Sequence, residues 1–206
     1  MASLAPPAGR IGPNAITRLA EALPRRVGAS TTREVFARAG LVHHLLEPPQ
    51  HMVDETEVRR LHGALRDTLG ETAALQLARE AGTLTARYLL AHRIPRPVQA
   101  LLRVLPAPLA ARLLLRAIAG HAWTFAGSGR FSHAVAPARQ CQATLRLQNN
   151  PLCRELQSAH PACAFYAATF ERLFRVLVDP DTVVTERTCA ARGEPACVFE
   201  ARWDRV

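Results

Sequence analysis

The spacing of apolar residues changes near Gly120, and this change constrains the fold more than any other feature of the sequence. Before Gly120, apolar residues recur every three or four positions, as on one face of an α-helix. After it, short stretches alternate between apolar and polar residues, as in a half-buried β-strand. Helices followed by strands, with one further helix late in the chain, predict an α+β fold in which N-terminal helices pack on an antiparallel sheet.

The helical periodicity predicts six helices before Gly120. Asp54 is a suitable N-cap for one of them, and Gly70 separates this helix from the next, so the two should pack as antiparallel neighbours. The expected helices cover residues 14–23, 31–39, 54–69, 71–92, 98–105 and 108–118. We expect residues 1–53 to form a helical extension and residues 54–206 to form one compact ligand-binding unit.

The alternating stretches predict strands that pair locally. Residues 121–125 and 131–135 are separated by a glycine-containing segment and indicate a β-hairpin, and residues 143–147 indicate a further strand. A helix is expected from Cys163 to Leu177, followed by a hairpin of residues 182–188 and 196–203. The last hairpin and the start of the helix before it should therefore meet at one end of the sheet.

Composition excludes several classes of protein. The net charge of +9 comes entirely from arginine, with no lysine, and no nucleic-acid motif accompanies it. The longest apolar stretch contains arginines and prolines that a membrane-spanning helix could not easily bury, and the N-terminus has no signal-peptide pattern. We therefore expect a cytoplasmic protein that does not bind nucleic acid, whose five cysteines stay reduced.

Three cysteines and a glutamate form the strongest chemical signal. Glu186 and Cys189 lie three residues apart at the end of one expected strand, Cys197 opens its partner, and Cys163 starts the late helix. Thiolate and carboxylate groups both bind Zn²⁺, and four protein ligands close a structural site. Two alternatives remain open, because free cysteines are often buried as small apolar residues and Cys189 could form a redox disulfide with Cys197.

The C-terminal part of the chain resembles the 4-vinyl-reductase domain family. In that family a late helix starts with cysteine, and the last hairpin reads E-x-x-C, a glycine-containing loop and C-x-F, as residues 186–199 do here. The resemblance implies a structural zinc ion held by Cys163, Glu186, Cys189 and Cys197, as in related sensor modules of transcription activators that respond to aromatic compounds. It also implies a homodimer and a role in bacteriochlorophyll biosynthesis, in the reduction of the 8-vinyl (4-vinyl) group of a tetrapyrrole.

Reduction of a vinyl group requires a source of hydride or electrons, which a protein normally binds as a cofactor. The sequence has no nucleotide, flavin or iron-sulfur motif, and zinc has no redox chemistry. We therefore expect a protein that binds a chlorophyll-precursor tetrapyrrole and delivers it to other enzymes of the pathway, rather than a self-sufficient reductase. A small-molecule-sensing regulatory module that acts through a partner and a true NAD(P)H-dependent vinyl reductase are the alternatives.

A pocket for a Mg-tetrapyrrole needs apolar walls, polar anchors and an axial ligand. The alternating stretches on both sides of Gly127 supply candidates: His121, Trp123, Phe125, Arg130, Phe131 and His133. A histidine could bind Mg²⁺, and Arg130 could meet a propionate. The alternative is that the aromatic residues are core and the histidines surface. The helix of residues 109–118, with Arg112 and Arg116 on its polar side, is a candidate for peripheral contact with a membrane.

Overall fold

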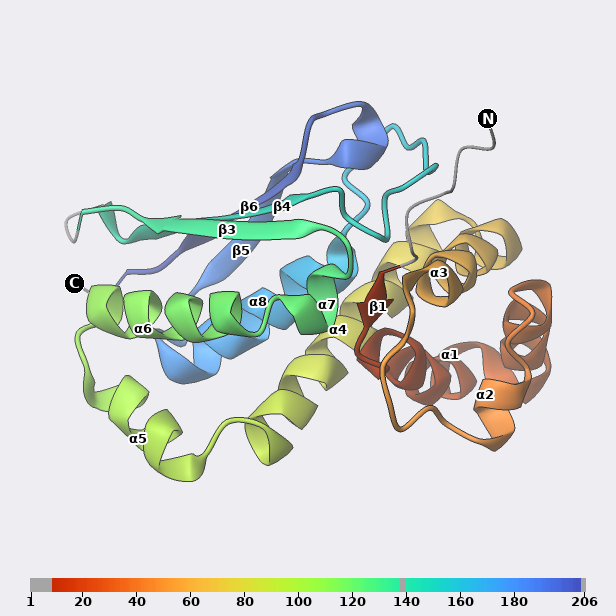
Figure 1. Cartoon of the computed structure of the whole chain (residues 1–206), viewed down its shortest axis with the longest axis horizontal. Helices are drawn as coiled ribbons and strands as arrows, with labels where there is room; N and C mark the ends of the chain where they lie inside the picture. Colours follow the sequence, from red (N-terminus) through yellow and green to blue (C-terminus); the bar gives the residue numbers. More distant parts are fainter. Residues whose placement is uncertain (1–8, 138–139, 205–206) are drawn as a thin grey trace, which may run out of the picture.

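The computed structural model describes residues 9–137 and 140–204. Its elements in chain order are β1 (Arg10–Ile11), α1 (Asn14–Arg38), α2 (His43–Leu46), β2 (Val53–Asp54), α3 (Glu55–Leu69), α4 (Glu71–His92), α5 (Arg96–Val104), α6 (Ala107–Gly120), α7 (Trp123–Ala126), β3 (Arg130–Val135), β4 (Gln142–Gln148), α8 (Ala164–Leu177), β5 (Val183–Thr188), η2 (Ala190–Arg192) and β6 (Cys197–Arg202). Most helices precede the sheet, and the predicted α+β class is confirmed (Figure 1).

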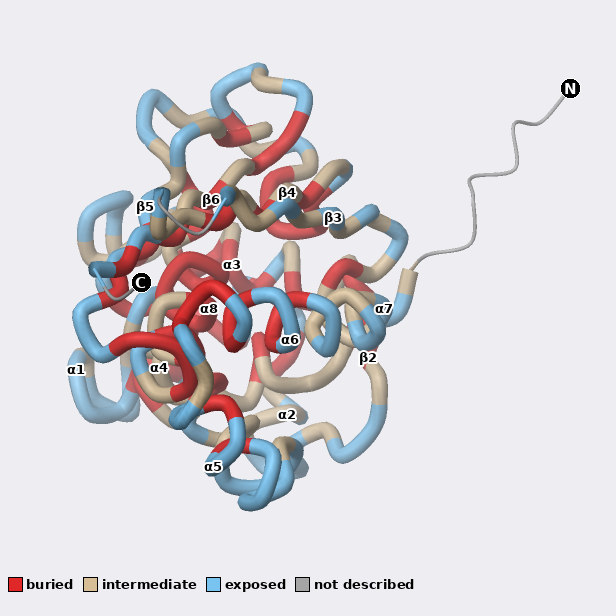
Figure 2. Tube along the Cα trace, turned by 90° about the vertical axis from the view of Figure 1, so that its left-hand side faces the viewer, coloured by how far each residue is buried: buried red, intermediate tan, exposed pale blue. Residues whose placement is uncertain are grey.

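The main sheet has the strand order β3-β4-β6-β5, and every neighbouring pair is antiparallel. The face toward α8 is apolar, because alternate residues of β4 and β6 are buried, among them Leu145, which lies opposite Phe199. Phe199 packs on Phe170 and Tyr166 of α8, with ring centroids 5.5 and 6.5 Å apart. The sheet thus covers one side of α8, and the buried residues gather around this helix and α4 (Figure 2).

Helix α4 covers the other side of α8 at very short range. A Cβ atom on Gly82 of α4 would lie 2.1 Å from the carbonyl oxygen of Phe165 in α8. Thr169 of α8 donates its hydroxyl hydrogen bond to the Gly82 carbonyl at 3.1 Å. Only glycine allows this approach, because any side chain would overlap the facing backbone.

Local signals explain the ends of α3, α4 and α1. The Asp54 carboxylate accepts a hydrogen bond from the Thr56 amide at 2.7 Å and caps α3, as its sequence predicts. Gly70, with φ of 79°, ends α3 and turns the chain into α4. The prediction of two separate helices at residues 14–23 and 31–39 was wrong in part: α1 runs from Asn14 to Arg38 and breaks only at Gly28, where φ is 79°.

The predicted strand at residues 121–125 was wrong, and so was the hairpin built on it. These residues form a turn and the short helix α7, since the Phe125 and Ala126 amides donate to the Ala122 carbonyl. Tertiary contacts hold this conformation: Tyr166 donates its hydroxyl hydrogen bond to the Phe125 carbonyl at 2.9 Å, and the Gly12 amide donates to the Thr124 carbonyl at 2.6 Å. Five residues of alternation are too few to outweigh such contacts.

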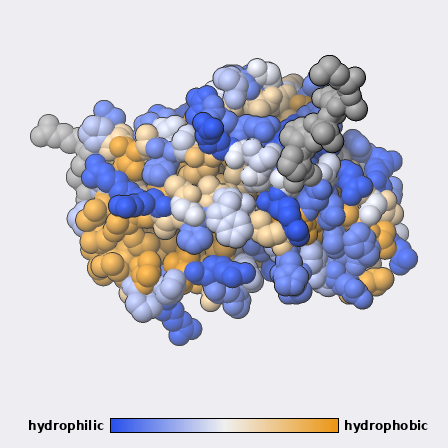
Figure 3. All heavy atoms as spheres, viewed as in Figure 1, coloured by the Kyte–Doolittle hydropathy of each residue, from blue (hydrophilic) through white to orange (hydrophobic). Residues whose placement is uncertain are grey.

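The exposed aliphatic side chains of α5 and α6 gather on the face seen in Figure 3. Within residues 9–137 and 140–204, no helix combines the length and hydropathy needed to cross a bilayer.

Candidate functional site: a four-cysteine cluster beside an aromatic face

Four buried cysteines meet where the sheet, α8 and the loop after β4 come together. Cys153 lies in that loop, Cys163 is the N-cap residue of α8, Cys189 follows β5 and Cys197 begins β6. Their sulfur atoms lie within 4.8 Å of one another. The Sγ···Sγ distances include 3.1 Å between Cys153 and Cys163 and 4.0 Å between Cys163 and Cys189.

These distances fit a mononuclear metal site. Four sulfurs at the usual Zn–S distance of about 2.3 Å form a tetrahedron with edges of about 3.8 Å, which lies inside the observed spread. A cluster of several iron atoms would hold its cysteine sulfurs farther apart. Four soft sulfur donors with no competing oxygen in the set are typical of structural zinc.

Backbone and amide N–H groups point at the sulfurs. The Asn150 side-chain amide donates to Cys163 Sγ at 3.1 Å and to Cys197 Sγ at 3.3 Å, and the Ala162 amide donates to Cys189 Sγ at 3.3 Å. Hydrogen bonds from the Cys153 and Cys163 thiols lower the pKa of Cys189 to about 6 and also lower that of Cys197. Thiolates are therefore favoured in this cluster, as metal binding requires.

Glu186 lies next to the cluster. Its Oε2 accepts a hydrogen bond from the Cys163 amide at 2.8 Å, while its buried Oε1 has no hydrogen-bond partner among the described residues. Burial, together with the charge of Cys189, raises the pKa of Glu186 to about 8. The tight set of donor atoms consists of the four cysteines, so a ligand role for Glu186 stays a prediction.

Cys153 is the member of this set that the sequence reasoning missed. It lies outside the hairpin motif, in a turn that follows Asn149-Asn150-Pro151, and no ligand spacing points to it. The available signal was its proximity in sequence to Cys163, ten residues later. The loop must fold back over the end of the sheet to bring the two thiols together.

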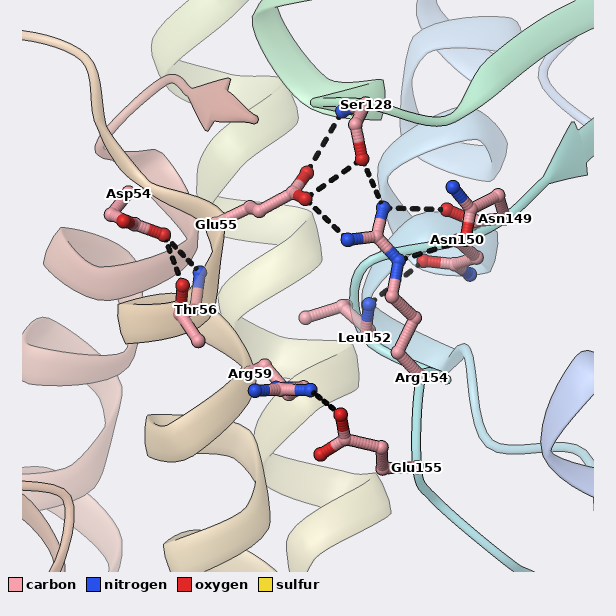
Figure 4. Close-up of polar contacts among 10 residues, drawn as sticks. All are labelled: Asp54, Glu55, Thr56, Arg59, Ser128, Asn149, Asn150, Leu152, Arg154 and Glu155. Carbon is pink, nitrogen blue, oxygen red and sulfur yellow. Dashed lines mark hydrogen bonds and ion pairs between the residues drawn. The ribbon is translucent and has the colours of Figure 1, made fainter. Parts of the chain in front are cut away.

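A polar network holds this loop against α3 (Figure 4). The Glu55 carboxylate accepts hydrogen bonds from the Ser128 amide and hydroxyl, both at 2.8 Å, and pairs with Arg154. Arg154 also donates to the Asn149 side chain at 2.8 Å. Although burial opposes it, these hydrogen bonds from Arg154 and Ser128 lower the pKa of Glu55. A second pair, Arg59 with Glu155, joins the same two segments at the surface.

Replacing Arg154 by alanine is expected to destabilise the protein by about 2–3 kcal/mol, because the Glu55 side chain is only 5% exposed and would lose its counter-charge. The matched control is Arg59→Ala, which breaks a pair whose glutamate is 78% exposed and should cost less than about 1 kcal/mol. Urea denaturation of both variants measures the difference. Equal losses would show that the Glu55 pair does not hold the loop.

Three of the six predicted pigment-binding residues come together. The Phe125 and Phe131 rings lie 5.4 Å apart, and Phe131 stacks with His133 at 6.1 Å and contacts Phe170 of α8. All three residues from this set are half-buried, on the side of β3 toward α6. Burial lowers the pKa of His133, which favours a neutral imidazole.

The other three residues lie elsewhere. His121 is exposed at the end of α6, where its Nδ1 lies 2.8 Å from the Ala117 carbonyl oxygen, and Arg130 is exposed at the start of β3. Trp123 is 61% exposed and lines an open hollow of about 530 Å³ with Arg10, His51, Met52 and Gly127. The expectation that His121, Trp123 and Phe125 share a strand face was therefore wrong, because they flank or form α7.

The site and the sheet around it define a 4-vinyl-reductase domain. The family model of this domain matches residues 143–203, which include all four cysteines of the cluster and Glu186. The predicted resemblance to the 4-vinyl-reductase family is confirmed.

Similarity to two curated proteins extends over nearly the whole chain. The Bacteriochlorophyll synthase 23 kDa chain of Cereibacter sphaeroides is 46% identical over 193 residues, covering 94% of this chain and 90% of that protein. The protein of the same name from Rhodobacter capsulatus is 43% identical, covering 92% of this chain and 85% of its own length. The chain therefore belongs to the family of bacteriochlorophyll synthase 23 kDa chains.

Solved structures with the same fold are H-NOX proteins. The Fe(II) unliganded H-NOX protein from K. algicida superposes with a TM-score of 0.61 at 11% identity, covering 94% of this chain and 97% of that one. An oxygen-binding H-NOX domain related to soluble guanylate cyclases gives a TM-score of 0.57 at 12% identity, with 94% and 95% coverage. At these identities the likeness concerns the fold alone.

Proposed function

We propose that this protein binds a chlorophyll-precursor tetrapyrrole and holds or delivers it for the enzymes that reduce its 8-vinyl group. Its family is named for bacteriochlorophyll synthase, which supports a pigment of that pathway as the ligand. The fold gives independent support, because titles of matching H-NOX structures refer to heme and to protein-induced porphyrin distortion. A porphyrin and a chlorophyll precursor share the tetrapyrrole ring.

The observation that carries this proposal is the aromatic face made by Phe125, Phe131 and His133 beside α8. Aromatic rings can stack on a flat conjugated ligand, and half-buried rings lose little further entropy when they do so. His133 is the best candidate for an axial ligand of Mg²⁺, since metal binding requires the neutral imidazole that burial favours. Arg130, at the exposed start of β3, is placed for a propionate.

The four-cysteine cluster has a structural role in this proposal. Cys153, Cys163, Cys189 and Cys197 would hold Zn²⁺, with Glu186 as the alternative donor to Cys153 in a four-coordinate site. Bound zinc would supply cohesion between the last hairpin, α8 and the loop after β4, and no redox chemistry. This argues for a carrier over a self-sufficient reductase. The predicted homodimer and cytoplasmic location remain part of the proposal.

Titration with protoporphyrin, its Mg complex and divinyl protochlorophyllide should shift the Soret band saturably. His133→Ala should weaken binding of the Mg complex at least about tenfold and leave metal-free protoporphyrin unaffected, because only the Mg complex uses an axial ligand. His121→Ala is the matched control, since its ring is exposed and lies outside the aromatic face.

Equal binding of the Mg complex by the His133→Ala variant and the unmodified protein would remove His133 as the ligand. A saturable shift with none of the three pigments would contradict the proposed function itself.

A further inference from the structure

The orientation of α5 is the reverse of that expected for a surface helix. Among its residues only Gln99 and Leu102 are buried, and the Gln99 side-chain amide donates to the carbonyl groups of Leu90 and Ile94 at 2.6 and 2.8 Å. A polar side chain thus anchors the helix, while Val98, Leu101 and Val104 point into solvent. Surface helices in water normally bury such aliphatic residues and expose the polar ones.

Helix α6 continues the same surface. Its Leu109 and Leu113 are exposed one turn apart, beside the exposed Arg112 and Arg116. The apolar side chains of both helices form the patch in Figure 3, and we call it the α5–α6 face: Val98, Leu101, Val104, Leu109 and Leu113, each between 42% and 77% exposed. A contiguous exposed patch of this kind marks an interaction surface.

The charge around this face has one sign. From residue 81 to residue 154 the sequence contains ten arginines and no aspartate or glutamate. Five of these arginines lie on or beside the face: Arg93, Arg96, Arg103, Arg112 and Arg116. The partner should therefore be apolar within and negatively charged at its surface.

We propose that the α5–α6 face docks peripherally on a bilayer containing anionic lipids. Short amphipathic helices with leucines on one side and arginines around them lie in the interface of such bilayers, with long arginine side chains reaching the headgroups. A second copy of this chain fits the face poorly, because a two-fold contact would bring arginines against arginines with no carboxylate between them. The proposal goes beyond pigment binding and does not depend on it.

Vesicle flotation tests the docking. The protein should float with vesicles of phosphatidylcholine and phosphatidylglycerol, but not with pure phosphatidylcholine, and raising the salt from about 0.1 M to about 0.5 M should release it. Leu101→Glu with Leu113→Glu should reduce partitioning at least about tenfold. The matched control is Leu46→Glu, at an 80% exposed leucine of α2.

A second pair of variants tests the charge. Arg112→Gln with Arg116→Gln should weaken partitioning about fivefold per arginine, or about 30-fold together. Arg33→Gln with Arg38→Gln, on exposed positions of α1, changes the net charge equally and should have little effect. Two results would overturn the proposal. One is the absence of flotation with anionic vesicles at low salt. The other is a dimer in lipid-free solution that the Leu101 and Leu113 substitutions convert to monomer.

Discussion

Stripping the metal from the four-cysteine cluster is expected to lower the stability by about 5 kcal/mol or more, equivalent to about 10–20 °C in Tm for a chain of this size. The reason is geometric, because four buried sulfurs lie within 4.8 Å of one another and, without a cation, must share protons or repel as thiolates. Chelation followed by thermal unfolding, and recovery on adding zinc, measures the effect.

Cysteine variants identify the ligands. Cys153→Ala should weaken zinc binding at least about 100-fold, while Cys141→Ala, outside the cluster, should not change it. Glu186→Gln decides between the two candidates for the fourth position. If the glutamate variant loses zinc and the Cys153 variant keeps it, the all-thiolate set is wrong. A native protein without stoichiometric zinc, whose cluster thiols react freely with an alkylating agent, would contradict the metal site altogether.

Replacing Gly82 by alanine should destabilise the protein by about 3 kcal/mol or more, because the new Cβ would lie 2.1 Å from a backbone oxygen of α8. Neither helix can shift freely, since α8 is held by the sheet on its other side. The expected fall in Tm is about 6–12 °C.

Gly63→Ala is the matched control for Gly82. It lies inside α3, and an added Cβ would have no neighbour within 4 Å, so alanine should stabilise the helix by about 0.5–1 kcal/mol. The two substitutions should therefore shift Tm in opposite directions. If both raise it, α4 and α8 do not approach as closely as described.

Much of the fold follows from periodicity and capping. The range Glu71–His92 was predicted to the residue, and α8, β5 and β6 lie within one residue of their predicted bounds. These elements are long or bounded by prolines, glycines and a capping residue, so local signals and tertiary contacts agree. Residues 121–125 differ because their conformation depends on contacts with Tyr166 and Gly12, which a local pattern cannot reveal.

The candidate site was predictable only where its residues share a local motif. Cys163, Cys189 and Cys197 were recognised from the late helix and the last hairpin, and the structure brings their sulfurs together. Cys153 depends on a loop held by Arg154 and Glu55, which are 99 residues apart. Nothing in the sequence distinguishes Glu55 from an ordinary glutamate in the first turn of a helix, where the helix dipole already favours it.

The most direct test of the proposed function is one gel-filtration measurement. The purified protein is incubated with divinyl protochlorophyllide and NADPH, separated from free pigment, and the mass of the co-eluting pigment is determined. A tetrapyrrole carrier predicts bound pigment in proportion to protein, with its mass unchanged. Pigment two hydrogen atoms heavier would identify a reductase instead, and protein that elutes without pigment would contradict the binding of a tetrapyrrole.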